Sequence, residues 1–519
     1  MNTAEFLMIA SSVVPERSAM VCGERSRAYA EMQERVNRLA NALQAMGIGK
    51  GDKVSVMALN SMEYVEIYYA GAKLGAVFVP LNYRAKQDEL SYMCNNSETK
   101  VLFVGERYLE LADKIKPDLQ TVAHTICIDS RPEGMPNLED LIAKHEPEEI
   151  FTDVEDNDPT IVIYTSGTTA LPKGVVLTYL GMSVYVTNTV EPADPAAESV
   201  DVLLVSVPFY HVAGATTMLS SVWGGRKMVI LPQFDPGAWL EAVQTHRVTH
   251  SFVVPTMLKR IMEHPDFDKM DLSSLKLVAY GAAPMPYEVV TRAVQRFECG
   301  LMNAYGQTES TSSLTFLGPD DHQIPEDPPA ERERKLQRLR SVGRPMEDVV
   351  VMIMDPEGEI LPPGQEGEIV AQGARVMAGY LGRGEETSEA MRGGWLHTGD
   401  VGWMDEDGYL YITGRTKDLI IRGGENIAPG EIEGVLQQHP AVEDAAVIGV
   451  PDVEWGEEVK AIVVPKGDYP SPEDLTSFVK RHLASYKAPK YYEFVDELPR
   501  NYLGKVLKTE LRKQYGQPG

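Results

Sequence analysis

The residues from 164 to 174, YTSGTTALPKG, are those best suited to chemistry. They directly follow an apolar run at 160–164 that predicts a β-strand. Hydroxyls, glycines and a lysine at the end of a strand suit phosphate binding, because hydroxyl and backbone N–H groups surround the oxygens while Lys173 adds a positive charge. The loop is not a GxxxxGK[ST] P-loop, since Pro172 and Gly174 occupy the positions of its second glycine and its magnesium-binding hydroxyl. The alternative is a Ser/Thr-rich surface loop.

The elements around this loop predict an α/β fold. Short apolar runs such as 54–59 and 101–104 alternate with amphipathic stretches such as 61–74, 235–246 and 286–297. This alternation is typical of parallel sheets with helices on both faces. We therefore expect a large N-terminal domain of doubly wound sheets.

The pattern changes in the last two hundred residues. Residues 318–340 are rich in proline and charge and predict an exposed excursion. Alternation and turns then predict a small, distorted β unit at about 341–416, which closes a large domain spanning 1–416. Residues 417–519 predict a small, mobile α+β domain, with helices near 429–438 and 472–484 and strands at 442–450 and 459–464.

Composition excludes several classes of protein. The chain has 519 residues, 43% hydrophobic and 24% charged, as expected for a folded globular protein. Its net charge of −27 disfavours binding to nucleic acid or anionic membrane surfaces. Four cysteines without a CxxC pattern give no disulfide framework. No segment approaches the ~18 apolar residues of a membrane span, so we expect no stable membrane insertion and a cytoplasmic protein; monomer and homodimer both stay open.

Five motifs in order carry a family resemblance. The chain resembles the adenylate-forming superfamily of acyl-CoA synthetases, luciferases and peptide-synthetase adenylation domains. The motifs and their family counterparts are YTSGTTALPKG at 164–174 (YTSGTTGxPKG), NAYGQTE at 303–309 (NxYGxTE), GWLHTGD at 394–400 (GWxxTGD), GRTKD at 414–418 (GRxKD) and PRNYLGK at 499–505 (PxxxxGK).

The resemblance implies an ATP-dependent, AMP-forming carboxylate–CoA ligase. A carboxylate attacks the α-phosphate of ATP, giving an acyl-adenylate and pyrophosphate, and the thiol of CoA then displaces AMP. Mg²⁺ is the implied cofactor, with ATP and CoA as co-substrates. Because both steps are reversible, the net direction, including ATP formation, is left open.

The resemblance also assigns residues to the nucleotide. Lys505 contacts the carboxylate and the α-phosphate, Tyr305 stacks on adenine, and Asp400 accepts the ribose hydroxyls. The implied catalytic residues are Lys505, Thr308 and Glu309, and the implied metal ligands are Glu309 and Thr168. The implied phosphate-binding residues are Thr165, Ser166, Gly167, Thr168, Thr169 and Lys173. The implied AMP-binding residues are Gly281, Ala282, Ala283, Asn303, Ala304, Tyr305, Gly306, Thr308, Asp400 and Arg415.

The remaining assignments concern the acyl group, the hinge and CoA. Tyr210, His211 and Gly306 are implied in the acyl pocket, Lys417 at the hinge, and Gly423, Gly424 and Glu425 at the CoA tunnel. Two departures from the family pattern stand out. Ala170 replaces a usual glycine, from which we expect altered pyrophosphate handling, and residues 179–181 replace a frequent HxN.

Two other functions stay open at this stage. One is an adenylating enzyme that loads the phosphopantetheine of a carrier protein, and the other is a non-catalytic nucleotide sensor. The expected substrate is a medium-sized carboxylate, whether aromatic, alicyclic or medium-chain, because the candidate pocket residues are small or aromatic.

Overall fold

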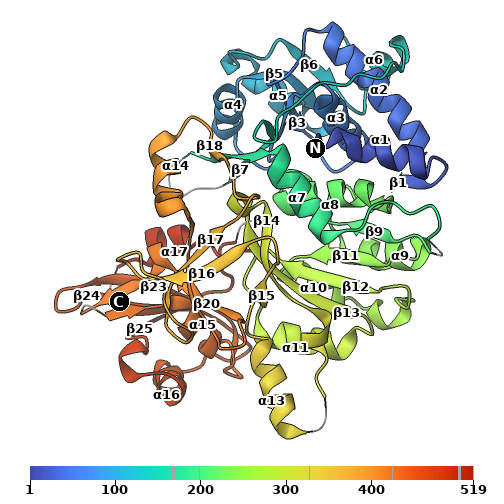
Figure 1. The fold of residues 1–519 in the computed structure, drawn as a ribbon. Coiled ribbons are helices and arrows are strands. Elements are labelled where there is room, and N and C mark those ends of the chain that lie inside the picture. Colours follow the sequence, from blue (N-terminus) through green and yellow to red (C-terminus); the bar gives the residue numbers. More distant parts are fainter. Residues whose placement is uncertain (166–170, 198, 326–327, 424, 501–503, 518–519) are drawn as a thin grey trace.

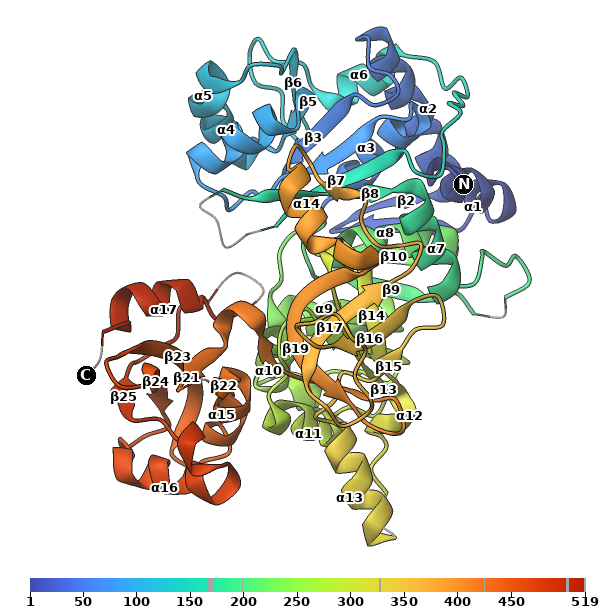
Figure 2. The ribbon, with the colours of Figure 1, turned by 60° about the vertical axis from the view of Figure 1, so that its left-hand side comes forward.

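The structure is a computed structural model that describes residues 1–165, 171–197, 199–325, 328–423, 425–500 and 504–517. A large body runs from the N-terminus to about residue 415, and a smaller C-terminal body lies beside it (Figures 1 and 2). The predicted fold class, a large α/β domain followed by a small α+β domain, is confirmed.

The described strands form four sheets, three of them in the large body. The first has the order β15 (Arg344–Pro345), β14 (Ser312–Leu317), β13 (Gly300–Gln307), β12 (Leu277–Gly281), β11 (His250–Val253), β9 (Val202–Val205), β10 (Lys227–Ile230), β1 (Ser18–Cys22) and β2 (Arg25–Ala28). The second has the order β18 (Gly379–Tyr380), β8 (Lys173–Thr178), β7 (Pro159–Thr165), β4 (Val77–Pro80), β3 (Lys53–Met57), β5 (Thr99–Val104) and β6 (His124–Cys127). The third is the predicted small β unit, β16 (Val350–Met354), β17 (Gly367–Gln372), β19 (Leu396–Met404) and β20 (Leu410–Arg415), and it is antiparallel.

The fourth sheet belongs to the small body. Its order is β22 (Glu425–Ile427), β21 (Ile420–Arg422), β24 (Gly456–Pro465) and β23 (Val442–Asp452), with β25 (Tyr491–Phe494) paired to β24.

Helices cover the sheets, as the alternating sequence pattern predicts. In the large body they are α1 (Ala4–Val13), α2 (Tyr29–Ala45), α3 (Met62–Lys73), α4 (Gln87–Asn96), α5 (Leu109–Ile115), α6 (Leu138–Lys144), α7 (Tyr179–Thr189), α8 (Val212–Trp223), α9 (Pro236–His246), α10 (Pro255–Met262), α11 (Tyr287–Arg296), α12 (Pro319–His322), α13 (Pro329–Arg338) and α14 (Gly384–Ala390). In the small body they are α15 (Pro429–Leu436), α16 (Pro472–His482) and α17 (Lys508–Tyr515).

Helix α3 illustrates how local sequence sets these elements. Ser61 begins the helix by accepting a hydrogen bond from the backbone N–H of Tyr64. Every residue of α3 is buried, including Tyr68, which packs edge-on against Phe78 of β4. The helix therefore belongs to the apolar core of the large body.

The excursion at 318–340 is more ordered than the sequence predicted. It contains α12 and α13, each of which begins with proline at its first turn, a position where the missing N–H costs nothing. Helix α13 has no buried residue and projects from the large body, as Figures 1 and 2 both show. Its exposure is as predicted, but helical order was missed because a helix without an apolar stripe has no periodicity to detect.

The two bodies touch at a few close contacts. A Cβ on Gly430, in the first turn of α15, would lie 2.6 Å from the carbonyl oxygen of Thr413 in β20. Lys259 of α10 forms an ion pair with Glu443 of β23. These contacts fix the orientation of the small body in this structure. Among the described residues, no helix has the length and apolar character needed to cross a membrane.

Candidate active site

A cavity of about 330 Å³ brings together residues from four of the five motifs. Its walls come from the ends of β7 and β8, the turn after β13, and the region around β18, β19 and β20. The lining residues are Thr165, Lys173, Gln307, Glu309, Tyr380, His397, Thr398, Gly399, Arg415, Thr416 and Lys417.

The two ends of the predicted phosphate loop meet at this cavity. Thr165 ends β7, Lys173 begins β8, and the two residues are paired in the antiparallel register. The Lys173 ammonium is ion-paired with Glu386 and lies 5.0 Å from the centre of the Tyr380 ring. The loop residues between these ends, among them the expected phosphate ligands, lie outside the described residues: Ser166, Gly167, Thr168, Thr169 and Ala170.

Glu309 lies on a 3₁₀ turn, Thr308–Ser310, directly after β13. Its carboxylate accepts a hydrogen bond of 2.9 Å from the Tyr380 hydroxyl, and its carbonyl accepts one from the backbone N–H of Met377. Thr308, beside it, is buried. The expected catalytic pair is therefore held from the β18 side of the cavity.

The donor set at Glu309 fits Mg²⁺ carried by a nucleotide. Mg²⁺ keeps several waters and takes one or two carboxylates together with substrate phosphates. Within the part of the chain that the structure describes, no group of three or more His, Cys, Asp or Glu side chains could hold a metal ion. A single carboxylate at a cation-rich cavity matches an ion shared with phosphates better than one bound by protein alone.

Asp400 links the motifs at 303–309 and 414–418. Its two oxygens accept hydrogen bonds of 2.8 Å from the Tyr305 hydroxyl and 2.6 Å from Arg415 Nε. Burial and the Asp400 charge raise the pKa of Tyr305 well above its usual value, so the phenol keeps its proton and remains a donor. Asp400 is 7% exposed, which makes it a fixed carboxylate against which a polar ligand could be oriented.

The turn that carries Asp400 is itself braced. Glu368 of β17 accepts from the backbone N–H of Gly399 at 3.2 Å and lies 2.8 Å from His397 Nδ1. The Thr398 hydroxyl donates to the carbonyl oxygen of Ile369. Gly399 has φ of +68°, a conformation that favours glycine.

Lys505 reaches this cluster from the small body. Burial lowers the pKa of its ammonium to about 8; Arg415 and Lys417 also lower it, while Asp400 and Asp418 act to raise it. Lys417 lines the cavity, and burial followed by the Arg415 charge lowers its pKa too. The structure thus places both expected lysines in the electrostatic field of Asp400 and Arg415.

Gly281 and Gly306 have packing reasons for being glycine. A Cβ on Gly281 would lie 2.1 Å from the carbonyl oxygen of Ala304, and one on Gly306 would lie 1.9 Å from that of Ser312. The expected nucleotide residues Gly281 and Ala304 are register partners on adjacent strands, and Asn303 is buried on the same strand as Ala304. A nucleotide role for these residues stays a prediction.

Ala282 and Ala283 follow directly after β12. Ala282 is exposed and has φ of +66°, a conformation that few residues other than glycine adopt. Because its methyl group is small, the backbone there remains open to a flat ligand. Ala283 is half-buried.

Tyr210 and His211 lie before α8, among aromatic rings. Tyr210 is buried and packs edge-on against Tyr83, with ring centres 5.1 Å apart. Burial lowers the pKa of His211 to about 4, so its ring is neutral at neutral pH. Neither residue lines the cavity described above.

Of the expected CoA-tunnel residues, Gly423 and Glu425 do not line the cavity in this orientation. A Cβ on Gly423 would lie 2.6 Å from Cε3 of Trp455, in the small body. Glu425 is exposed on β22, and Gly424 lies outside the described residues. The structure therefore does not place Gly423 or Glu425 beside Arg415 and Lys417 in the cavity wall.

Sequence reasoning missed Tyr380, and with it Glu386. Both come from the segment after β17, far along the chain from Lys173 and Glu309, which they contact. Neither belongs to one of the five motifs, and their roles follow only from the pairing of β18 with β8.

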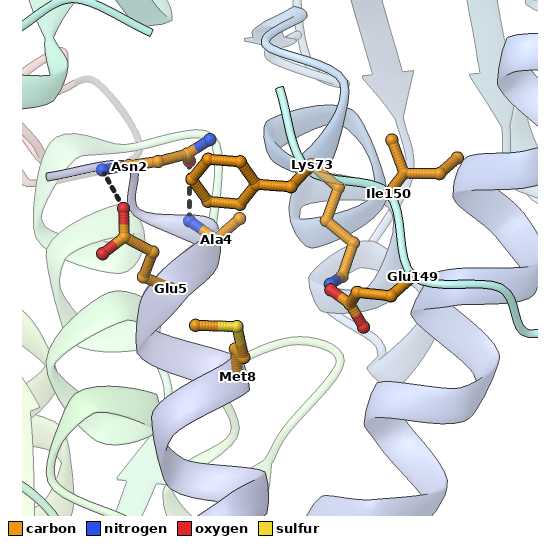
Figure 3. A pocket seen from close by; sticks show the side chains of 8 residues that line it. Asn2, Ala4, Glu5, Met8, Lys73, Glu149 and Ile150 are labelled. Atoms are coloured by element: carbon orange, nitrogen blue, oxygen red, sulfur yellow. Dashed lines mark hydrogen bonds and ion pairs between the residues drawn. The ribbon is translucent and has the colours of Figure 1, made fainter. Parts of the chain in front are cut away.

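A second cavity, beside α1, is too small for a substrate (Figure 3). Its volume of about 10 Å³ is at the limit for a single water. The buried Lys73 ammonium, whose pKa burial lowers, is ion-paired there with Glu149. This pair balances its own charge and ties α3 to the chain near residue 150.

Comparisons with known proteins agree with the family resemblance that the five motifs carry. The family model described as AMP-binding enzyme matches residues 10–381, and that described as AMP-binding enzyme C-terminal domain matches 431–505. Similar relatives include a feruloyl-CoA synthase of Amycolatopsis (38% identical; 97% of this chain and 96% of the relative covered) and a fatty acid–[acyl-carrier-protein] ligase of Streptomyces coeruleorubidus (33% identical; 96% and 94%). A solved Mycobacterium tuberculosis fatty acyl CoA synthetase superposes with a TM-score of 0.79 at 33% identity, covering 99% of this chain and 98% of that one.

The chain therefore belongs to the adenylate-forming superfamily of AMP-binding enzymes. Within that class it is an AMP-forming carboxylate–CoA ligase that uses ATP and CoA as co-substrates. The sequence-based prediction of this enzyme class is confirmed.

Proposed function

We propose that the 330 Å³ cavity binds ATP and activates a medium-sized monocarboxylate, whose acyl group carries no second charge, for transfer to CoA. The observation that carries this proposal is that three cationic side chains and one carboxylate line the cavity of an acidic chain. Lys173, Arg415 and Lys417 line the cavity, and Lys505 shares their field, although the whole chain carries −27. Such a site attracts a polyphosphate that the remaining surface repels.

The nucleotide is oriented by groups at the two ends of the cavity. Thr165 and Lys173 border the loop that would hold the phosphates, together with Ser166, Gly167, Thr168 and Thr169. Asp400 would accept the ribose hydroxyls while Arg415 balances its charge, and Tyr305 would stack on the adenine. The remaining AMP contacts in the proposal are Gly281, Ala282, Ala283, Asn303, Ala304, Gly306 and Thr308.

Lys505 makes the first step possible by neutralising two anions. The substrate carboxylate forms a bond to the α-phosphorus, the bond from that phosphorus to the bridging oxygen breaks, and pyrophosphate leaves. An ammonium held between carboxylate and phosphate lowers their repulsion in the transition state. In the second step the CoA sulfur bonds to the acyl carbon, its proton passes to solvent, and AMP leaves.

Mg²⁺ would be held by Glu309, with Thr168 as the second candidate, and would neutralise the charge on the phosphates. On the chain's side, the Tyr380 hydroxyl orients the Glu309 carboxylate.

Lys417 is the proposed hinge between domain 1–416 and domain 417–519. Rotation there would withdraw Lys505 and bring Gly423, Gly424 and Glu425 to the cavity for thioester formation. The exposed position of Glu425 in the present orientation is compatible with such a move.

The acyl group is proposed to be uncharged and in part aromatic. Tyr83, Tyr210 and His211 form an aromatic cluster, and the His211 ring is neutral because its pKa is about 4. Aromatic rings and a neutral imidazole favour an apolar acyl group over one that carries a second carboxylate. The similarity to a feruloyl-CoA synthase supports an aromatic acid.

A panel of carboxylic acids, scored by pyrophosphate release from ATP with and without CoA, tests the proposal. Aromatic monocarboxylates should release pyrophosphate and then form CoA thioesters, and dicarboxylates should be poor substrates. Transfer to a holo-carrier protein but not to CoA would favour the carrier-loading alternative, which the similarity to a carrier-protein ligase keeps in view. Nucleotide binding without acid-dependent pyrophosphate release would favour a sensor.

A cytoplasmic location and a homodimer belong to the same proposal. Cell fractionation tests the location, and light scattering tests the oligomeric state.

A further inference from the structure

Lys173 has a carboxylate partner outside the motifs. Its ammonium is ion-paired with Glu386 of α14, and the two side chains are only 19% and 32% exposed. Glu386 is held in turn by Arg383, whose guanidinium lies 2.9 Å from the other carboxylate oxygen. The Lys173 ammonium lowers the pKa of Glu386, so the carboxylate is charged at neutral pH.

Arg383 ties this pair to the phosphate loop. It donates to the carbonyl oxygen of Pro172, the residue before Lys173, at 3.3 Å, and to the Tyr92 hydroxyl at 3.0 Å. The backbone after Lys173 is also fixed, because the N–H of Leu381 donates to the carbonyl oxygen of Gly174 at 2.8 Å. Backbone and side-chain contacts therefore converge on the second half of the phosphate loop.

The same segment reaches the opposite wall of the cavity. Gly379 and Tyr380 pair with Val176 and Val175 of β8, which brings the Tyr380 ring under the Lys173 ammonium. The Tyr380 hydroxyl donates to Glu309. Lys173 and Glu309 are thus held by one stretch of chain, residues 379–387, whose turn is closed by Thr387 Oγ1 accepting from the N–H of Tyr380.

A lysine side chain is long and flexible, and ordering it costs up to ~2 kcal/mol in lost rotamer freedom. A carboxylate that holds the ammonium in place before the ligand arrives removes part of that cost from binding. Since Arg383 already balances part of its charge, Glu386 can hold Lys173 without presenting a full negative charge to a polyphosphate.

We propose that Glu386 is a positioning residue, which holds the Lys173 ammonium at the cavity so that it meets the β- and γ-phosphates of ATP. This inference rests on the proposed function, because it requires ATP in the cavity. Glu386 itself touches no reacting atom. Its effect should therefore appear only for ligands that carry the outer phosphates and only while Lys173 is present.

The test measures binding of Mg–ATP and of AMP, without acid, by calorimetry for Glu386→Gln. The matched control is Glu385→Gln, an exposed neighbour that loses the same charge. We expect Glu386→Gln to weaken ATP binding about tenfold, which corresponds to about 1.4 kcal/mol. AMP binding should be unchanged, and Glu385→Gln should match the wild type for both ligands.

A double-mutant cycle with Lys173→Met isolates the route of the effect. If Glu386 acts through Lys173, Glu386→Gln adds nothing to ATP binding in the Lys173→Met background. Equal weakening of ATP and AMP, additivity with Lys173→Met, or wild-type ATP affinity in Glu386→Gln would each overturn the inference. If the wild type bound neither nucleotide, the proposed function would fall with it; if the wild type binds ATP and releases pyrophosphate, only the positioning role is at stake.

Discussion

The surroundings of the Lys505 ammonium favour the loss of its proton. Burial and two nearby cations lower the pKa of its ammonium to about 8. The catalytic form in the proposed mechanism is the protonated one. It is fully present well below pH 8 and is lost as the pH rises through that value.

The first prediction is an alkaline fall in adenylation. kcat/KM for ATP, measured by pyrophosphate release, should decline above about pH 8, because this parameter follows ionisation of the free enzyme. Lys505→Arg keeps its charge at every accessible pH, so it should be slower but lack the alkaline fall. An unchanged fall in Lys505→Arg would assign the titration to another group.

The second prediction concerns Asp400, which holds Tyr305 and Arg415 by hydrogen bonds. Asp400→Asn removes the charge that balances Arg415 and weakens the acceptor for the ribose. We expect ATP and AMP to lose affinity equally, on the order of tenfold or more for a buried charged pair. Wild-type enzyme should prefer ATP over 2′-deoxy-ATP and 3′-deoxy-ATP, and the variant should lose most of that preference. A preserved preference would remove Asp400 from the ribose site.

At the scale of single residues, sequence motifs predicted where the cations and carboxylates would gather. Lys173, Glu309 and Arg415 all line the cavity. Tyr380 and Glu386 could not be predicted, because they contact Lys173 and Glu309 only through the pairing of β18 with β8. Contacts between distant segments follow from topology rather than from local pattern.

At the scale of elements, β13 and β14 approach each other closely at Gly306. The register shifts between Tyr305 and Gly306, and a Cβ at Gly306 would lie 1.9 Å from the carbonyl oxygen of Ser312. Ser312 has φ of +80°, so the backbone on the partner strand is already in an uncommon conformation. The glycine is needed for this approach whether or not a ligand touches it.

The third prediction is that Gly306→Ala lowers stability as well as activity. The added methyl group should cost about 1–3 kcal/mol, as overpacking does in a tight site, and lower the melting temperature. Gly49→Ala is the control, because a Cβ at that position would have no atom of the described residues within 4 Å, and its melting temperature should be unchanged or slightly higher. A Gly306→Ala enzyme of normal stability that lost only acid or nucleotide affinity would favour a purely ligand-facing role.

Periodicity predicted the elements that have apolar faces. Residues 61–74 and 235–246 became α3 and α9 within one residue at each end. Helix α13 escaped prediction because it has only one large apolar side chain, Leu336, which is too few to give a periodic pattern. The antiparallel pairing of β7 with β8, which closes the phosphate loop, also does not follow from periodicity.

At the scale of the whole molecule, one orientation of the small body presents Lys505 to the cavity. The residue before it, Gly504, has φ of +81°, and a Cβ there would lie 2.6 Å from Cγ2 of Thr256 in α10. Gly504, which directly precedes Lys505, therefore packs directly on the large body. Sequence could not predict this orientation, because the motifs are compatible with either position of a hinged domain.

The fourth prediction is that Gly504→Ala separates the two half-reactions. The clash with Thr256 should slow pyrophosphate release about tenfold, since steric and backbone strain of this kind costs ~1–2 kcal/mol. Formation of the CoA thioester from supplied acyl-adenylate should stay at the wild-type level. Gly467→Ala has a similarly positive φ within the small body but no neighbour within 4 Å among the described residues, so both half-reactions should be unaffected. Equal loss of both half-reactions in Gly504→Ala would contradict this account.

The contrast between an acidic exterior, −27 overall, and a cationic cavity has a consequence for how nucleotide is captured. At low ionic strength the acidic surface repels an approaching tetra-anion over long distances, whereas the cations of the cavity attract it only at short range; physiological salt shortens the reach of both effects to ~8 Å. Added potassium chloride should therefore accelerate ATP arrival in stopped-flow traces while also hastening its departure. A surface that steered the anion toward the cavity would give slower arrival at higher salt, so the sign of the ionic-strength slope is itself diagnostic of this charge layout.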